Sequence, residues 1–316
     1  MFELIWNINL LLAWLVGLYT FVHSVCMLAK CLIRNYLRQP LDLAKRYGKG
    51  SWAVVTGSTG GIGAEYCKQL AKQGFNLVLF GRNKDKLEEL DAKLKKDNSL
   101  LQTQIVVADF AEDNSAKFYE HLYRKIQKLD ISILINNAGA VIPEFFENCK
   151  LESAISCSNI NMTGPAMLTR MFINDFLKRT SRTAIINVSS LIRVVPSPYI
   201  KEYPSTKQFL TLFSYYLQDN YGDKIDIQDL NPAVVTTNLN NHQIGPDSIT
   251  PEHCVASSLR DLGQEFCTVP AMIHSFIGQM LFVMNKFMKP LYRATFVNNY
   301  EMEILGSFYE KHRNKK

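Results

Sequence analysis

The sequence has few features of a disulfide-bonded or metal-binding protein. Its seven cysteines are an odd number and form no CxxC motif, and its six histidines show no metal-ligand spacing. We therefore expect reduced, mostly buried thiols that face the cytosol, and no metal site. The 16 glycines and 11 prolines are too few for a collagen-like or low-complexity chain.

A basic nucleic-acid-binding face is also missing. The net charge is +6, but residues 1–50 hold six basic and two acidic side chains, and residues 311–316 hold four basic ones. The remainder of the chain has a slight acidic excess, so we expect no nucleic-acid partner. Basic ends beside apolar segments favour an anionic membrane surface instead.

Charged side chains are absent between Leu4 and Ala29. The block 10–29 has about the length of a helix that crosses a bilayer. Six basic residues follow it closely, which predicts that the next domain faces the cytosol. The start also lacks the basic segment of a cleavable signal peptide. We expect a membrane anchor over 1–30 and a basic connector over 31–50, with a buried or interfacial helix as the alternative.

Beyond residue 50, short apolar runs alternate with segments of helical periodicity. This alternation predicts right-handed crossovers and an α/β fold, a Rossmann-like doubly wound parallel sheet with helices on both faces. Ligands of such sheets bind at the carboxyl ends of the strands. The expected strands are 52–56, 76–80, 104–108, 131–135, 184–188 and 225–230, and the expected helices are 62–73, 84–96, 114–128, 161–179 and 203–219.

The first expected strand runs into a glycine-rich loop, Thr56-Gly-Ser-Thr-Gly-Gly-Ile-Gly63. Glycines permit a sharp turn and let a pyrophosphate approach the N–H groups of the following helix, although a tight structural turn is the alternative. The second strand ends at Gly81, where NAD-binding proteins usually carry an acidic residue. Arg82 follows instead, and a guanidinium can bind a 2′-phosphate. We therefore expect NADPH/NADP+ as the cofactor.

Tyr203 and Lys207 lie four residues apart, so they share one face of a helix. A phenol with a pKa of about 10 is a poor acid-base catalyst at neutral pH, and a nearby ammonium group lowers that pKa. Pro204 disfavours a helical residue before it, so the helix should begin here.

Four motifs in this order resemble the short-chain dehydrogenase/reductase family. The loop 56–63 matches its cofactor loop, and Asn136-Asn-Ala-Gly139 matches the motif after its fourth strand. Ser190 precedes Tyr203 by the family's usual 13 residues, and Pro232-Ala-Val-Val-Thr-Thr237 matches its nicotinamide-contacting segment. The resemblance implies an NADP-dependent oxidoreductase acting on CH–OH groups, with Asn161, Ser190, Tyr203 and Lys207 as catalytic residues. The implied cofactor contacts are Gly57, Ser58, Thr59, Gly61, Ile62, Gly63, Arg82, Asp109, Asn136, Ala138, Gly139, Tyr203, Lys207, Pro232, Val235 and Thr237.

The resemblance also implies a role for each catalytic residue. Tyr203 protonates the incipient alkoxide, and Ser190 hydrogen-bonds the carbonyl oxygen of the substrate. Lys207 lowers the pKa of Tyr203 and holds the nicotinamide ribose, while Asn161 supports a proton-relay water. Neighbouring strand residues face opposite ways, so Ser189 should point away from the site.

Within the family, the chain resembles the membrane-anchored branch of 17β-hydroxysteroid dehydrogenases and very-long-chain 3-oxoacyl-CoA reductases. The anchor with its connector, Leu79-Phe-Gly-Arg-Asn-Lys-Asp-Lys-Leu87, and Thr250-Pro-Glu252 before apolar residues 270–284 carry this resemblance. It implies reduction of a lipid ketone at the endoplasmic reticulum membrane, either an acyl-CoA of fatty acid elongation or a 17-ketosteroid. A catalytically dead NADPH-binding scaffold and a structural membrane protein are the non-enzyme alternatives. Family relatives often pair through long helices, so the resemblance allows a homodimer and leaves the oligomeric state open.

The predicted NADP-binding domain covers 51–265, with a polar, mobile substrate lid over 238–262. An apolar C-terminal extension and a basic tail follow over 266–316. Residues 269–285 fit a substrate-pocket helix, an in-plane membrane helix or a second span. His274, within this segment, is expected to be structural.

Overall fold

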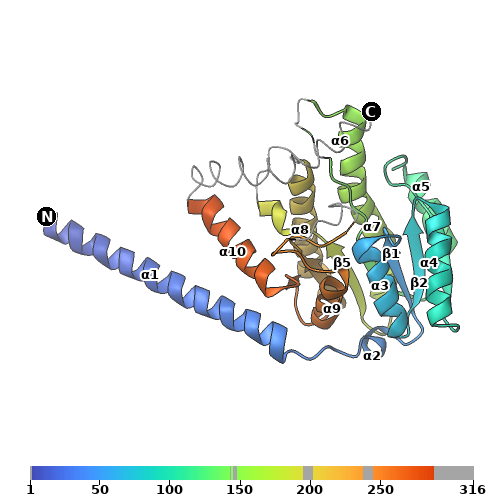
Figure 1. Cartoon of the computed structure of the whole chain (residues 1–316), viewed down its shortest axis with the longest axis horizontal. Helices are drawn as coiled ribbons and strands as arrows, with labels where there is room; N and C mark the ends of the chain where they lie inside the picture. The colour runs from blue at the N-terminus through green and yellow to red at the C-terminus, as the bar shows by residue number, and fades with distance from the viewer. Residues whose placement is uncertain (1, 143, 145–147, 195–201, 238–244, 288–316) are drawn as a thin grey trace. The chain divides into compact units, whose positions relative to one another are not determined.

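The computed structural model describes residues 2–142, 144, 148–194, 202–237 and 245–287 (Figure 1). The chain forms two compact units, residues 1–39 and 40–316. The first unit is one long helix, α1 (Phe2–Leu32), followed by a π turn, η1 (Ile33–Leu37). Its apolar side chains are exposed, Trp14 by 77%. The stretch Asn9–Leu37 is long and apolar enough to cross a membrane, as the sequence predicts for an anchor.

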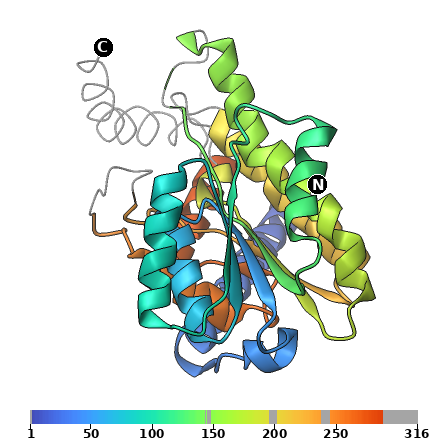
Figure 2. The ribbon, with the colours of Figure 1, turned by 90° about the vertical axis from the view of Figure 1, so that its right-hand side faces the viewer.

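The second unit is built on one parallel sheet in the order β3-β2-β1-β4-β5-β6-β7 (Figure 2). The predicted α/β fold with a doubly wound parallel sheet is confirmed. Six strands match the expected ones within a residue or two, and the two-residue edge strand β7 was not predicted. The strands are β1 (Trp52–Thr56), β2 (Asn76–Gly81), β3 (Thr103–Val107), β4 (Ile131–Asn136), β5 (Thr183–Val188), β6 (Ile225–Leu230) and β7 (Cys267–Thr268).

Helices cover both faces of this sheet, because successive residues of each strand point to opposite sides. In β1, Ala53 and Val55 join the apolar core on one face, whereas Val54 joins the core on the other. The first core is completed by α2 (Leu43–Tyr47), α3 (Gly61–Lys72), α4 (Lys84–Asp97) and α9 (Pro251–Asp261), and the second by α5 (Ala116–Ile126), α7 (Gly164–Lys178) and α8 (Glu202–Tyr221).

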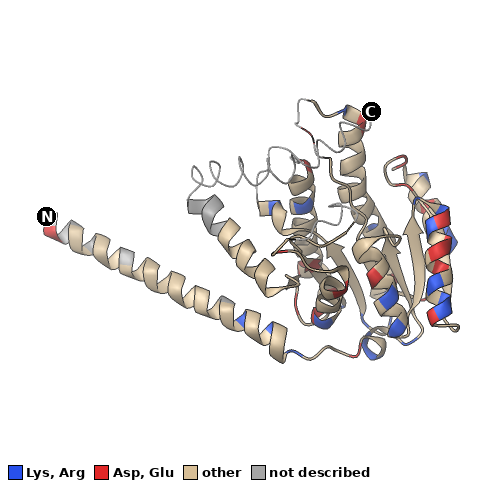
Figure 3. Cartoon of the chain, in the orientation of Figure 1, with Lys and Arg blue, Asp and Glu red and all other residues tan. Residues whose placement is uncertain are grey.

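Charged side chains follow the exposed side of the helices. The sequence of α4, KDKLEELDAKLKKD, buries Leu87 and Leu94 and leaves its Lys, Asp and Glu side chains on the outside, whereas α1 is nearly without charge (Figure 3). The contrast separates an amphipathic surface helix from an apolar one.

The second unit begins at residue 40, earlier than the expected boundary at residue 51. Within the predicted connector, α2 buries Leu43 and Tyr47. The Nε of Arg46 lies 2.6 Å from Oδ2 of Asp226 in β6, and the hydroxyl of Tyr47 donates to the same oxygen at 2.7 Å. Arg182 donates to the other oxygen of this carboxylate at 2.9 Å. The end of the connector is therefore fixed to the sheet.

One continuous helical stretch is longer than expected. It comprises α6 (Leu151–Ser158), the π turn η3 (Asn159–Thr163) and α7, whereas the sequence predicted a helix over 161–179. Pro165 lacks an N–H and would clash with the carbonyl of Asn161 in a regular α-helix. The π turn η3, which is wider than an α-helical turn, contains Asn161 and so lies where this clash would occur.

Half of the predicted lid is a core helix. Thr250 caps α9 by accepting from the N–H of His253 at 3.2 Å, and Cys254, Val255 and Leu259 of α9 are buried in the core shared with α3. Residues 251–261 therefore belong to the helical layer, and the predicted lid is reduced to its first part. Of that part, residues 238–244 lie outside the described residues, as does the predicted basic tail.

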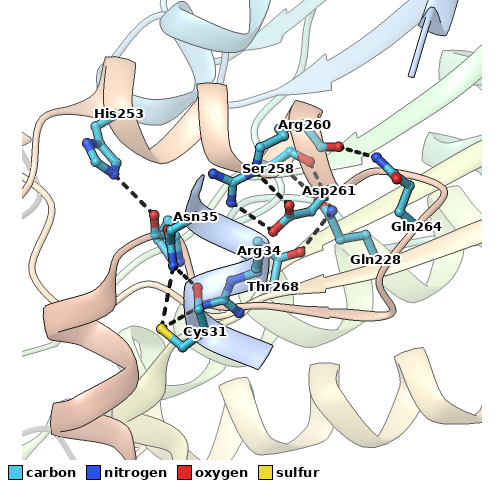
Figure 4. A network of polar contacts seen from close by, with 11 residues as sticks. Cys31, Arg34, Asn35, Gln228, His253, Ser258, Arg260, Asp261, Gln264 and Thr268 are labelled. Carbon is cyan, nitrogen blue, oxygen red and sulfur yellow. Dashed lines mark hydrogen bonds and ion pairs between the residues drawn. The ribbon is translucent and has the colours of Figure 1, made fainter. Parts of the chain in front are cut away.

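Buried polar side chains tie α9 to the sheet (Figure 4). The amide nitrogen of Gln228 in β6 donates to the carbonyl of Ser258 at 3.0 Å and to the hydroxyl of Thr268 in β7 at 3.1 Å. The hydroxyl of Ser258 donates back to Oε1 of Gln228. These bonds satisfy groups that would be costly to bury unpaired, and they fix α9 in register with both strands.

Candidate active site

The cofactor loop leaves β1 at its carboxyl end and enters α3. Gly57 and Gly61 have φ values of +64° and +50°, which favour glycine. A Cβ on Gly63 would lie 2.2 Å from the carbonyl oxygen of Gly57, so this position also requires glycine. The N-cap, Gly60, contributes no side-chain cap to α3. The helix N-terminus can therefore receive an anion such as a pyrophosphate.

The remaining residues of this loop divide between two roles. Ser58 is fully buried, and both its N–H and its hydroxyl donate to the carbonyl of Phe80 in β2, at 3.0 and 3.1 Å. Thr59 and Ile62 are partly exposed. Ser58 therefore holds the loop against β2, and Thr59 and Ile62 are open to a ligand.

Thr56 and Asn137 join the loop to the end of β4. The hydroxyl oxygen of Thr56 accepts from the N–H groups of Asn137 and Ala138, both at 2.9 Å. The side-chain amide of Asn137 donates to the carbonyls of Thr56 and Gly57 at 2.9 and 3.2 Å. Ala138 thus lies beside the loop, as the sequence predicts for a cofactor-contacting residue.

Asn136, a predicted cofactor contact, is buried in the core of the unit. It is 1% exposed, and its amide donates to Oδ1 of Asn187 in β5 at 2.8 Å and to Thr169 of α7 at 3.3 Å. Asn136 therefore holds β4 to its neighbours β5 and α7 beneath the cofactor site. The sequence did not single out Asn137, whose side chain contacts the loop.

The ends of β2 and β3 carry the two residues predicted to meet the adenosine part of the cofactor. Arg82 is exposed and follows Gly81 directly. Asn83 accepts from the N–H of Lys86 at 2.9 Å and so begins α4 there. Asp109 follows β3, and its Oδ1 accepts from the N–H of Ala111 at 2.9 Å. Thus no acidic residue stands at the end of β2, and a guanidinium is free to turn toward a ligand.

The segment 232–237 lies at the ends of β5 and β6. The carbonyl of Pro232 accepts from the N–H of Leu191 at 2.9 Å. Val235 is buried and pairs with Ile249, and a Cβ on Gly61 would lie 2.7 Å from Cγ2 of Thr237. Thr237 therefore sits directly beside the cofactor loop.

His274 in α10 (Met272–Phe287) supports this segment from behind. It is fully buried, its Nδ1 accepts from the N–H of Ala233 at 3.2 Å, and its Nε2 lies 2.9 Å from the carbonyl of Asp247. Burial lowers the pKa of His274, so its neutral form is favoured. The placement agrees with a structural role.

Tyr203 and Lys207 lie on the first turns of α8, which begins at Glu202. The hydroxyl of Ser190 lies near enough to that of Tyr203 to lower the pKa of Tyr203, and Nζ of Lys207 lies 5.4 Å from the centre of the Tyr203 ring. Nζ of Lys207 donates to the carbonyl of Val188 at 2.7 Å. The three predicted catalytic side chains thus lie together.

Burial changes the ionisation of both α8 residues. It lowers the pKa of Lys207 to about 8 and raises the pKa of Tyr203, an increase that the hydrogen bond with Ser190 opposes. A phenol with a raised pKa stays protonated at neutral pH. The lowering of the Tyr203 pKa that the sequence predicted from Lys207 is therefore not found in this structure.

Asn161 lies in the π turn η3, where such turns often mark functional sites. Its Oδ1 accepts from the N–H of Ala140 at 2.9 Å, and its amide nitrogen donates to the carbonyl of Ala140 at 2.8 Å and to Thr206 at 3.1 Å. A Cβ on Gly139 would lie 3.5 Å from both Oδ1 of Asn161 and Nζ of Lys207. Gly139 therefore lies next to both predicted catalytic residues.

Ser189 and Ser190 point in different directions. Ser189 is 2% exposed, and its hydroxyl donates to the carbonyl of Lys207 at 2.9 Å and contacts the hydroxyl of Thr211 at 2.9 Å. Ser190 lies 3.3 Å from the carbonyl of Pro232 and reaches Tyr203. Ser189 thus faces the core, and Ser190 faces the ligand side.

Comparisons with known proteins place this geometry in a family. The family model for short chain dehydrogenases matches residues 51–246. This chain belongs to the short-chain dehydrogenase/reductase family. It is 33% identical over 240 residues to human very-long-chain 3-oxoacyl-CoA reductase (74% of this chain and 75% of the relative). It is also 34% identical over 250 residues to zebrafish 17-beta-hydroxysteroid dehydrogenase type 3 (77% and 80%).

Solved structures of the family share this fold. A 7beta-hydroxysteroid dehydrogenase aligns with a TM-score of 0.67 and 23% identity over 78% of this chain and 95% of that chain. A short-chain dehydrogenase from Sphingobium yanoikuyae in complex with NADPH aligns with a TM-score of 0.63 and 24% identity over 75% and 96%. The chain is therefore an NAD(P)-dependent oxidoreductase, and the predicted branch of the family is confirmed by the curated relatives.

Several residues of this short-chain dehydrogenase site escaped the sequence analysis. Asn137, Thr206 and Asp229 all hydrogen-bond within or directly beneath the site. For Asp229, the available signal was a polar residue inside an otherwise apolar strand, Ile225-Asp-Ile-Gln-Asp-Leu230. Among the described residues, no group of three or more His, Cys, Asp and Glu side chains could hold a metal ion.

Proposed function

We propose that this protein is a membrane-anchored, NADPH-dependent ketoreductase that reduces very-long-chain 3-oxoacyl-CoA. The observation that carries the proposal is the grouping of Ser190, Tyr203 and Lys207 at the carboxyl edge of the sheet, with the cofactor loop at the same edge. The relative named very-long-chain 3-oxoacyl-CoA reductase supports the substrate.

The residues at this edge fit an NADPH molecule. The glycine-rich N-terminus of α3 suits the pyrophosphate, Asp109 suits the adenine, and Thr237 suits the carboxamide. The exposed guanidinium of Arg82 suits the 2′-phosphate, which favours NADPH over NADH. When bound, NADPH supplies the hydride that no side chain can provide.

The side chains supply the remaining chemistry. Ser190 donates a hydrogen bond to the substrate carbonyl oxygen and fixes its position. Tyr203 gives its phenolic proton to that oxygen as negative charge develops there. Lys207 stabilises the phenolate that remains, and Asn161 orders the path by which the phenol recovers a proton.

Reduction of a 17-ketosteroid is the second candidate. It is favoured by the identity of 34% to 17-beta-hydroxysteroid dehydrogenase type 3 over 80% of that relative. Both substrates are membrane-associated lipid ketones with a carbonyl that the same three side chains can bind. The choice between them lies in the substrate pocket and leaves the chemistry unchanged.

The proposed location is the endoplasmic reticulum membrane, with the catalytic unit in the cytosol. The apolar stretch Asn9–Leu37 supports an anchor. The six basic residues after Ala29 support the orientation, because basic residues are retained on the cytosolic side. A homodimer remains a prediction.

The test is NADPH oxidation by the full-length protein in detergent, with a long-chain 3-oxoacyl-CoA or a 17-ketosteroid as substrate and NADH as the alternative cofactor. We expect Tyr203→Phe to lower kcat by about 10²- to 10⁴-fold, because the general acid is lost. Tyr216→Phe, the same change at an exposed position of α8, should leave kcat unchanged. Wild-type protein that binds NADPH and turns over neither ketone would support the scaffold alternative instead.

A further inference from the structure

A carboxylate lies fully buried beneath the Tyr203–Lys207 pair and has no part in the reaction described above. Asp229 of β6 is 0% exposed and faces α8. An ionised carboxylate in a protein core is costly unless hydrogen bonds and opposite charges compensate it. A carboxylate at this depth therefore calls for an explanation from its partners.

Both oxygens of Asp229 accept hydrogen bonds. Oδ1 accepts from the hydroxyl of Thr211 at 3.3 Å, and Oδ2 accepts from the amide nitrogen of Asn231 at 2.8 Å. A carboxylate that accepts on both oxygens is stabilised in its ionised form. Thr211 lies four residues after Lys207, on the same face of α8.

Hydrogen bonds continue from Asp229 to the catalytic residues. Thr211 contacts the hydroxyl of Ser189 at 2.9 Å, and Ser189 donates to the carbonyl of Lys207 at 2.9 Å. Ionised Asp229 can only accept, so the single proton of Thr211 points to it. Ser189 also has a single proton, which it shares between the carbonyl of Lys207 and the oxygen of Thr211.

Two cations face Asp229 from different elements. They are Lys207 on α8 and Arg193 on η4 (Leu191–Val194). Burial raises the pKa of Asp229 above its usual value, and the hydrogen bond from Asn231 and the two cations offset part of that increase. Burial lowers the pKa of Lys207, and Cys157 and Asp229 raise it in part. The other titratable groups around these charges are Tyr203 and Cys157 near Lys207, and Tyr215 near Asp229, with Cys267 next to Tyr215.

We propose that Asp229 is a positioning residue of the active site, which keeps the ammonium group of Lys207 charged and fixes the hydroxyl of Thr211, one helical turn after Lys207 and in contact with Ser189. The catalytic meaning of this inference rests on the proposed function, because a charged Lys207 matters only if Tyr203 exchanges a proton. The charge coupling itself is independent of turnover.

The first experiment measures the ionisation of Lys207 without turnover. The full-length protein is acetylated with trace acetic anhydride over a range of pH, and the Lys207 peptide is quantified by mass spectrometry, since only the neutral amine reacts. In Asp229→Asn, which keeps the shape and removes the charge, the midpoint for Lys207 should fall by about one pH unit. The exposed Lys125 serves as the internal reference whose midpoint stays in place.

Thr211→Ser is the matched control. It keeps the hydroxyl that donates to Asp229 and removes only a methyl group, so the Lys207 midpoint should stay near the wild-type value. Should Asp229→Asn not yield folded protein, Asn231→Leu tests the same charge by removing the donor to Oδ2. The carboxylate is then less stable, and the Lys207 midpoint should again fall. An unchanged midpoint in either variant would overturn the proposal.

The second experiment follows ketone reduction against pH. If Lys207 must be charged, the activity of Asp229→Asn should decline at lower pH than that of the wild type, by the shift seen in the labelling. A loss by one factor at every pH would mean a structural role only and would contradict the inference. If the wild type reduces neither ketone, the proposed function fails, while the labelling result still decides the coupling of Asp229 to Lys207.

Discussion

The two halves of the ligand-binding edge of the sheet are held in place by different means. Around β1 and β4, the backbone forms the site: three glycines of the loop 57–63 have geometry that a Cβ would disturb, and Thr56 and Asn137 bond mainly to main-chain atoms. Around β5, β6 and α8, buried side chains form the site, among them Lys207, Ser189 and Asp229.

This difference follows from what each half must bind. A pyrophosphate needs N–H groups at close range, which a backbone without side chains provides. Proton transfer to a ketone needs groups whose ionisation is tuned, which requires burying them. The half around β1 and β4 should therefore be destabilised by any added side-chain atom. The half around β5, β6 and α8 should become more stable when a buried charge is removed.

The largest effect should come from adding one methyl group to the backbone-built half. In Gly63→Ala, the new Cβ would lie 2.2 Å from the carbonyl oxygen of Gly57, a contact that only a backbone movement relieves. We expect a loss of about 3 kcal/mol or more in the free energy of unfolding, together with loss of NADPH binding. Urea unfolding and NADPH fluorescence titration measure the two effects.

Gly139→Ala is the control for that comparison, because its Cβ would meet Asn161 and Lys207 at 3.5 Å, an ordinary contact. Its free energy of unfolding should change by less than about 1 kcal/mol. Equal losses in the two variants would mean that the glycine loop has no special steric requirement.

The next effect has the opposite sign and lies in the catalytic half. The folded-state pKa of Lys207 is about 8, against 10.5 for the free side chain. Below pH 8 the folded and unfolded states both bind this proton, and burial of the charge costs about 3 kcal/mol at most. Between pH 8 and 10.5 the unfolded state binds more protons than the folded state, so the free energy of unfolding rises with pH. Lys207→Met should abolish activity, raise the stability at neutral pH by up to that amount, and remove this rise.

Urea unfolding between pH 7 and 10.5 measures this slope. Lys125→Met, on an exposed side of α5, should keep both the slope and the stability of the wild type. If Lys207→Met were less stable than the wild type at pH 7, the ammonium group would be stabilising, and the contrast between the two halves would fail.

The sequence predicts the backbone-built half better than the side-chain network. Apolar runs and glycine spacing place β1, β2 and β4 within a residue, because these patterns depend on local periodicity. The spacing of Tyr203 and Lys207 also gives their shared helix face. By contrast, α9 has a mixed sequence, PEHCVASSLRD, and its burial depends on partners such as Tyr66, whose hydroxyl lies 2.6 Å from that of Ser258.

Partners inside the catalytic half also depend on tertiary contacts. Strand alternation predicts that Ser189 and Ser190 point apart, and the structure agrees. It cannot tell which of Asn136 and Asn137 contacts the loop, because that choice depends on where β4 ends. Asp229 pairs with Thr211 across 18 residues of sequence, a relation that local pattern does not contain.

The smallest effect tests whether the neutral bonds of the catalytic half stabilise it. The amide of Asn187 donates to the hydroxyl of Ser214 at 2.8 Å, and both residues are fully buried. Ser214→Ala leaves that donor without this partner, so we expect a loss of about 2 kcal/mol in the free energy of unfolding. Ser99→Ala, at an exposed position, should stay within about 0.5 kcal/mol of the wild type. If Ser214→Ala were as stable as Ser99→Ala, the neutral hydrogen bonds of the catalytic half would not contribute to its stability.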